Sequence, residues 1–152
     1  MVDSPNRHTL DDPFHLERFV RAQAPAYDRA LEELRRGHKE THWMWFVFPQ
    51  LEGLGASPTS RFYGISGADE ALAYLRHPVL GPRLLECATA LLQIDGRSAR
   101  DILGPPDDLK LQSSATLFSH ISPGDSPFDR LLEKYFQGTR DDRTLQRLVS
   151  ST

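Results

Sequence analysis

The longest uninterrupted apolar stretch in this chain has six residues and runs from Trp43 to Phe48. A membrane-spanning helix needs about 20 such residues, so we expect no membrane span. A stretch this apolar is also a poor solvated face, and we expect it to lie in the core or to line a pocket. Its length does not distinguish a helix from a strand.

The rest of the composition is that of an ordinary globular protein. The chain has 152 residues, which predicts one domain, and it is 39% hydrophobic and 26% charged. The single cysteine, Cys87, excludes an internal disulfide framework and a cysteine-based zinc cluster. Residues 1–9 lack the apolar segment of a secretory signal, so we predict a cytoplasmic protein.

The charge balance disfavours a general polyanion binder. There are 18 basic and 21 acidic residues, giving a net charge of −3, so nucleic acid is an unlikely partner. A small basic group at Arg35 and Arg36 is interleaved with Glu32 and Glu33. This pattern favours a solvated helix face with internal ion pairs.

Helix start and stop signals recur along the chain. Ser-x-x-Asp and Pro signals mark the starts, and glycines such as Gly37 mark the ends. We predict a mainly α, compact single domain of about seven or eight short helices over residues 11–149, preceded by a flexible segment over residues 1–10. Residues 52–64 are rich in glycine and are predicted to be a loop.

Three segments could carry chemistry. The first is the apolar run, whose ends bear Lys39, Glu40, His42 and Gln50. It could be the central core element or the wall of a ligand pocket. Both tryptophans, Trp43 and Trp45, lie in it, and a buried indole N–H needs a hydrogen-bond acceptor.

The second segment covers residues 106–118. Lys110, Ser113 and Ser114 have the spacing i, i+3 and i+4, so they share one side of a helix. A lysine beside two hydroxyls can hold an anionic or polyhydroxylated ligand. The alternative is an ordinary solvated helix face.

The third segment is the predicted loop, which contains Arg61 and Tyr63. Glycines and hydroxyls beside a cation suit a phosphate or a sugar. The segment lacks the Gly-Lys-Ser/Thr ending of a P-loop, and it could equally be a plain connection.

The six histidines do not predict a metal centre. Only His38 and His42 have the spacing i, i+4, and Gly37 is expected to end the helix before them. No zinc signature accompanies the pair, so we predict no metal site and no cofactor.

Several motifs in order resemble one bacterial and fungal family, the domain of unknown function number 1810, some members of which are labelled calpastatin-like. The matching segments are Asp12 to Phe14, His42 to Gln50, Tyr63 to Ile65, His77 to Gly81 and Ile102 to Phe118. The resemblance covers roughly Asp11 to Leu148. It implies a small, mainly α-helical single domain and no particular activity. Ala115 departs from the family pattern, which usually has Met there.

From these segments we predict a cytosolic protein that binds or hydrolyses a small anionic or nucleotide-derived ligand in an aromatic-lined pocket. Whether it is an enzyme stays open, and His42 is the preferred acid/base because its unperturbed pKa lies near 6.5. The expected ligand-binding residues are Lys39, Trp43, Trp45, Gln50, Arg61, Tyr63, Lys110, Ser113 and Ser114.

Two other interpretations stay open. An exposed aromatic patch would instead make the chain a non-catalytic protein-interaction module. The same polar residues could also form a buried network that only fixes the core.

Overall fold

The computed structural model describes residues 11–150, so the predicted flexible segment over residues 1–10 lies outside the described residues. Within them the protein is mainly helical, as predicted. Ten α-helices are present there: α2 (Glu17–Gln23), α3 (Tyr27–Arg36), α4 (Met44–Val47), α5 (Pro58–Phe62), α6 (Ala68–Arg76), α7 (Leu80–Leu92), α8 (Ala99–Leu103), α9 (Asp107–His120), α10 (Pro127–Phe136) and α11 (Asp142–Ser150).

The predicted number of seven or eight helices was too low because two short helices escaped the pattern. Helix α4 has four residues and lies inside the apolar run, where every position is apolar and no period can be read. Helix α5 has five residues and lies inside the segment predicted to be a loop. Its N-terminus carries a recognisable signal, since Ser57 accepts a hydrogen bond from the Ser60 N–H and Pro58 follows it.

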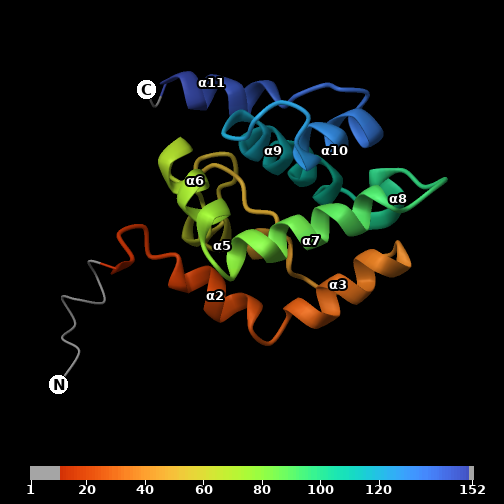
Figure 1. Cartoon of the computed structure of the whole chain (residues 1–152), viewed down its shortest axis with the longest axis horizontal. Coiled ribbons are helices and arrows are strands. Elements are labelled where there is room, and N and C mark those ends of the chain that lie inside the picture. The colour runs from red at the N-terminus through yellow and green to blue at the C-terminus, as the bar shows by residue number, and fades with distance from the viewer. Residues whose placement is uncertain (1–10, 151–152) are drawn as a thin grey trace.

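The helices form two groups on either side of α7. Figure 1 shows α2 and α3 along one edge of the molecule and α9, α10 and α11 along the other. Helix α7 packs against α3, α6 and α10, while α9 packs against α6, α8, α10 and α11. The only β pairing in the part of the chain described is one parallel bridge between Leu51 and Ile65.

Helix boundaries follow the expected capping chemistry. Ser98 and Ser126 each form a capping box with an aspartate three residues later. Gly37 ends α3 with a φ of 74°, a conformation that glycine adopts without steric cost.

The junction of α6 and α7 explains the His77–Gly81 motif. The His77 Nδ1 accepts hydrogen bonds from the N–H groups of Val79 (3.1 Å) and Leu80 (3.2 Å), which lie at the start of α7. A Cβ atom on Gly81 would lie 2.0 Å from the Leu75 carbonyl oxygen. This close approach of two helices therefore requires glycine.

The core is continuous and contains most of the aromatic side chains. Trp43, Phe48, Tyr74 and Phe118 are all buried. Cys87 is also buried, and burial raises the pKa of its thiol to about 12. No described helix combines the length and apolar character that crossing a membrane demands.

A buried ion pair fixes the segment before α6. The Arg18 Nη2 lies 2.8 Å from the Glu70 Oε2, and both side chains are almost completely covered. Arg18 also donates to the carbonyl oxygens of Phe62 (2.8 Å) and Gly64 (3.0 Å). These contacts hold the segment next to Ile65. Ile65 forms the bridge with Leu51 and so helps to place the neighbouring Gln50.

Candidate functional site

Two lysines from distant segments meet at one carboxylate. The Asp107 Oδ2 lies 2.9 Å from the Lys39 Nζ, and its Oδ1 lies 3.3 Å from the Lys110 Nζ. The side chain of Lys39 is only 6% exposed, whereas that of Lys110 is 23% exposed. Asp107 therefore neutralises a buried lysine and also holds a second lysine whose ammonium group reaches the surface.

Each of these lysines also lies over a tryptophan. The Lys39 Nζ is 5.1 Å from the ring centroid of Trp43, and the Lys110 Nζ is 4.8 Å from that of Trp45. Both distances are within the range of a cation–π interaction. We call Lys39, Trp43, Trp45, Asp107 and Lys110 the lysine–tryptophan cluster.

The loop that carries the cluster is anchored by Glu33. Its carboxylate accepts hydrogen bonds from the Glu40 N–H, the Thr41 N–H and hydroxyl, and the Trp43 Nε1–H, the last at 2.9 Å. Burial alone would raise the pKa of Glu33, but these hydrogen bonds outweigh it and hold the pKa at about 2. Sequence analysis placed Glu33 on a solvated face, and that was wrong because its side chain is completely buried.

Beside the cluster lies a hollow of about 330 Å³ between the first turns of α9, the first turn of α11 and the segment 50–60. We call it the α9–α11 hollow. It is lined by Gln50, Leu54, Gly55, Ser60, Pro106, Leu109, Lys110, Gln112, Ser113, Asp141 and Arg143. Lys110 thus belongs to both the hollow and the lysine–tryptophan cluster.

The hollow carries two cations and one carboxylate. The cations are Lys110 and Arg143, and an Arg143 Nη2–H donates to the Leu54 carbonyl oxygen at 3.3 Å. The carboxylate is Asp141, whose Oδ2 accepts from the Thr144 N–H (3.0 Å) and the Thr144 hydroxyl (2.5 Å). The Asp141 Oδ2 also lies 3.2 Å from the Ser113 hydroxyl.

The hollow also lies beside the N-terminal turns of two helices. Residues from the first turns of both α9 and α11 line it, and the N-terminal end of a helix carries partial positive charge. The charge of Asp141 is partly offset by its three donors. The arrangement suits a small group with negative charge.

The structure brings together six of the predicted residues in the hollow and the adjoining lysine–tryptophan cluster, and four others belong to neither. Gln50, Lys110 and Ser113 line the hollow, and Lys110 connects it to Trp45 and, through Asp107, to Lys39. Trp43 is buried and belongs to the core, although Lys39 lies over its ring.

Four predicted residues belong neither to the lining of the hollow nor to the lysine–tryptophan cluster. Arg61 and His42 are exposed elsewhere on the surface. Tyr63 packs against Phe19 and Phe46. Ser114 is buried, and its hydroxyl has no hydrogen-bond partner in the part of the chain described.

Sequence reasoning missed Asp107, Asp141 and Arg143 as site residues. The signal for Asp107 was its position three residues before Lys110, which places both on one helix face. No local sequence pattern pointed to Arg143, because 89 residues separate it from its hydrogen-bond partner Leu54.

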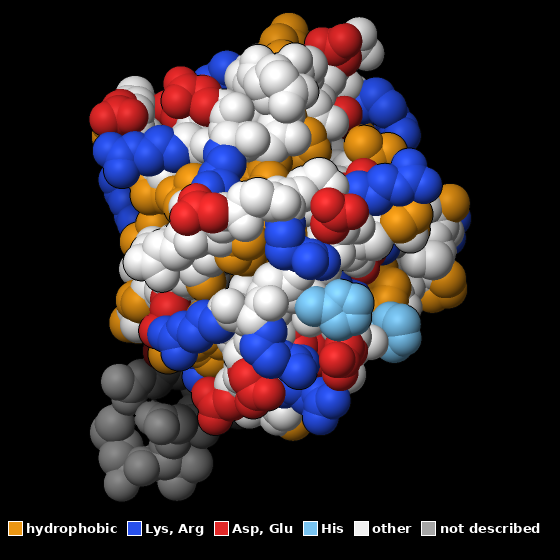
Figure 2. Space-filling model, turned by 90° about the vertical axis from the view of Figure 1, so that its right-hand side faces the viewer, with side chains coloured by type: hydrophobic (Ala, Val, Ile, Leu, Met, Phe, Trp, Pro, Cys, Tyr) orange, Lys and Arg blue, Asp and Glu red, His pale blue; other side chains and the backbone are white. Residues whose placement is uncertain are grey.

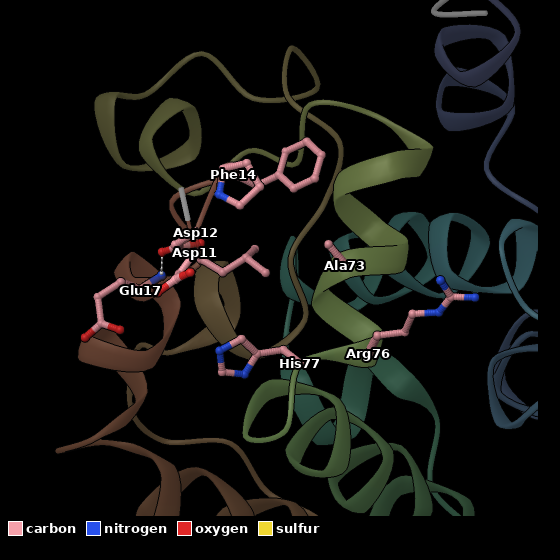
Figure 3. Close-up of a pocket in the computed structure, with 9 residues that line it drawn as sticks. Asp11, Asp12, Phe14, Glu17, Ala73, Arg76 and His77 are labelled. Atoms are coloured by element: carbon pink, nitrogen blue, oxygen red, sulfur yellow. Dashed lines mark hydrogen bonds between the residues drawn. The ribbon is translucent and has the colours of Figure 1, made fainter. Parts of the chain in front are cut away.

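A second hollow of about 460 Å³ lies between α2 and α6. Figure 3 shows its acidic residues, Asp11, Asp12 and Glu17, on the side of α2, and Arg76 directed away from them. The Asp12 carboxylate accepts hydrogen bonds from the N–H groups of Leu16 and Glu17. None of the predicted site residues lines this hollow.

The arginines of α3 are paired with carboxylates, two of them within the helix as predicted and Arg35 with a carboxylate of α7. Arg29 contacts Glu33, Arg35 contacts Glu86 and Arg36 contacts Glu32, all within 4 Å. Figure 2 shows Lys and Arg side chains interspersed with Asp and Glu over the face in view. Among the residues described, no group of three or more His, Cys, Asp or Glu side chains is arranged to hold a metal ion.

Comparison with known families gives one match that spans most of the chain. The model of the family described as "Protein of unknown function (DUF1810)" matches residues 13–148. The chain belongs to the DUF1810 family. The resemblance found in the sequence motifs is thereby confirmed.

A solved structure is similar to this DUF1810 chain in both fold and sequence. It is the crystal structure of the conserved hypothetical protein Rv1873 from Mycobacterium tuberculosis, which is 56% identical. The match has a TM-score of 0.89 and covers 91% of this chain and 99% of that one. Comparison of the DUF1810 chain with curated proteins gives no match.

Proposed function

We propose that the α9–α11 hollow binds a small ligand through a phosphoryl group. The observation that carries this proposal is the convergence of Lys110 and Arg143 with the first turns of two helices on one concave site. Phosphoryl oxygens are bound by such combinations of cations and helix N-termini. At about 330 Å³ the hollow is at the lower end of the range for ligand pockets, so the ligand is small.

The position of Lys110 supports this role. Its ammonium group is held by one Asp107 oxygen at 3.3 Å and by the face of Trp45, which leaves donor capacity for a ligand. The Lys39 Nζ lies 2.9 Å from the other Asp107 oxygen, so the carboxylate is shared between two lysines. This sharing reduces the hold of Asp107 on Lys110 and favours contact with an incoming anion.

The proposal is limited to binding. His42, the residue preferred for acid/base chemistry, is exposed and does not line the hollow, and the lining residues include no aromatic side chain. The alternative of an exposed aromatic patch gains no support from Trp43, because that side chain is 1% exposed.

A thermal-shift titration with inorganic phosphate tests the proposal. The wild type is compared with Lys110→Gln, which removes one cation from the hollow. Arg61→Gln is the matched control, because it removes one exposed cation that does not line the hollow. At 100 times the dissociation constant, binding adds about 2.7 kcal/mol of stability.

We expect phosphate to raise the melting temperature of the wild type and of Arg61→Gln, and to leave that of Lys110→Gln unchanged. Sodium chloride at matched ionic strength separates binding from general screening. An equal response of all three proteins would contradict the proposal.

A further inference from the structure

We infer that the ligand of the α9–α11 hollow is a polyol phosphate, with a hydroxyl close to its phosphoryl group. This inference rests on the proposed phosphoryl site and concerns the part of the ligand next to that group. It is carried by Asp141, an acceptor in a hollow that otherwise favours anions.

The two oxygens of Asp141 differ in what they can bind. Its Oδ2 accepts from the Thr144 N–H and hydroxyl and is 3.2 Å from the Ser113 hydroxyl. Its Oδ1 has no hydrogen-bond partner in the part of the chain described, and it is not one of the buried atoms that lack a partner there. The Oδ1 is therefore an accessible acceptor.

Asp141 is also held in place by its backbone. Its N–H donates to the Thr116 hydroxyl at 2.9 Å, and that hydroxyl donates to the Gln112 carbonyl oxygen at 2.8 Å. The carboxylate is therefore fixed by contacts with both α9 and the first turn of α11. A preorganised acceptor loses little conformational entropy when a donor binds to it.

Gln50 adds a second polar group without a partner. Its side-chain amide has no hydrogen-bond partner among the described residues, and it lines the same hollow. An amide both donates and accepts, which matches a hydroxyl group.

These groups define the complementary ligand. The phosphoryl oxygens need the donors of Lys110 and Arg143, whereas the Asp141 Oδ1 repels them and needs a donor from the ligand. A hydroxyl on a carbon near the phosphate ester oxygen meets both requirements. The small volume favours a short polyol such as glycerol over a nucleoside.

Isothermal titration calorimetry with ethyl phosphate and glycerol phosphate tests the inference on the wild type. The two esters share the phosphoryl group and differ in hydroxyl groups. We expect glycerol phosphate to bind about tenfold more tightly, the effect of one added hydrogen bond to a charged acceptor. Equal affinity for the two esters would overturn the inference and leave the phosphoryl site intact.

The variant Asp141→Asn tests whether this carboxylate causes the preference for glycerol phosphate over ethyl phosphate. Asparagine is as good an N-terminal cap as aspartate. The donors of Thr144 and Ser113 select the amide oxygen, so the NH₂ group takes the place of the Oδ1. We expect the preference for glycerol phosphate to fall to about twofold or less, without weaker binding of ethyl phosphate.

Asp142→Asn is the matched control, because Asp142 neighbours the hollow in sequence but does not line it. We expect it to keep the tenfold preference. A tenfold preference that persists in Asp141→Asn would overturn the inference. Failure of both esters to bind the wild type would instead refute the phosphoryl site itself.

Discussion

The Lys39 ammonium lies 2.9 Å from the Asp107 carboxylate and connects the loop after α3 to the first residue of α9. The Lys39 backbone N–H also connects this loop to α8 by donating to the Ile102 carbonyl oxygen at 2.7 Å. The lysine that faces solvent, Lys110, is positioned by the same carboxylate. The buried ion pair therefore supports the geometry of the proposed binding site.

Removing Asp107 should leave a buried lysine without its counter-charge. We expect Asp107→Ala to lower the free energy of unfolding by about 3 kcal/mol, because Lys39 is only 6% exposed. Lys110→Met, which removes the more exposed partner, should cost about 1 kcal/mol or less. Urea denaturation measures both values, and similar costs for the two variants would contradict this assignment.

Glu33 should make the stability of the protein depend on pH in the acid range. Its pKa is about 2 in the folded state and 4.5 as the ordinary value, so the unfolded state binds the proton more readily. The contribution of Glu33 is complete above pH 4.5 and is lost as the pH falls toward 2, in total about 3 kcal/mol.

Unfolding free energies of the wild type and Glu33→Gln at several pH values test this contribution. The difference between the two proteins should shrink as the pH falls from 5 to 2, as expected for a group with a lowered pKa. A difference that stays constant over this range would show that the charge of Glu33 does not contribute.

The two tryptophans should differ in their importance for stability. Trp43 is buried and donates to Glu33, whereas Trp45 is half-buried and its indole N–H has no partner in the residues described. We expect Trp43→Phe to cost about 2 kcal/mol more than Trp45→Phe, because it removes a donor from a buried carboxylate. Equal costs, measured by denaturation, would argue against this role of Glu33.

Gly81 should tolerate no side chain. The Cβ atom of Gly81→Ala would lie 2.0 Å from a backbone oxygen of α6, so we expect a loss of about 2 kcal/mol or more. Gly124→Ala is the control, since no atom lies within 4 Å of its added Cβ. A thermal melt of both variants checks this prediction, and an unchanged melting temperature for Gly81→Ala would contradict the packing described.

Local signals predicted much of this fold. The capping serines Ser98 and Ser126 and the left-handed Gly37 are short-range features, and the structure has helix boundaries at all three. Whether Trp43 to Phe48 forms a helix or a strand could not be predicted, because a uniformly apolar run has no hydrophobic periodicity. The burial of Glu33 could not be read either, because its partners belong to a loop whose path depends on the packing of Trp43.

The candidate site was predicted only in part, and for a related reason. Lys110 and Ser113 share a helix face, which sequence spacing reveals. Their approach to Gln50, Asp141 and Arg143 depends on how α9, α11 and the segment after α4 pack together. No local pattern encodes that packing, and Arg61 was included for its residue type although it lies outside the hollow.

The most direct test of the phosphoryl site is a titration of isotope-labelled protein with inorganic phosphate, followed by the backbone amide resonances. We expect saturable shifts that centre on Lys110, Asp141 and Arg143 and that disappear in Lys110→Gln. Shifts that centre instead on the arginines of α3, or no saturable shifts at all, would contradict it.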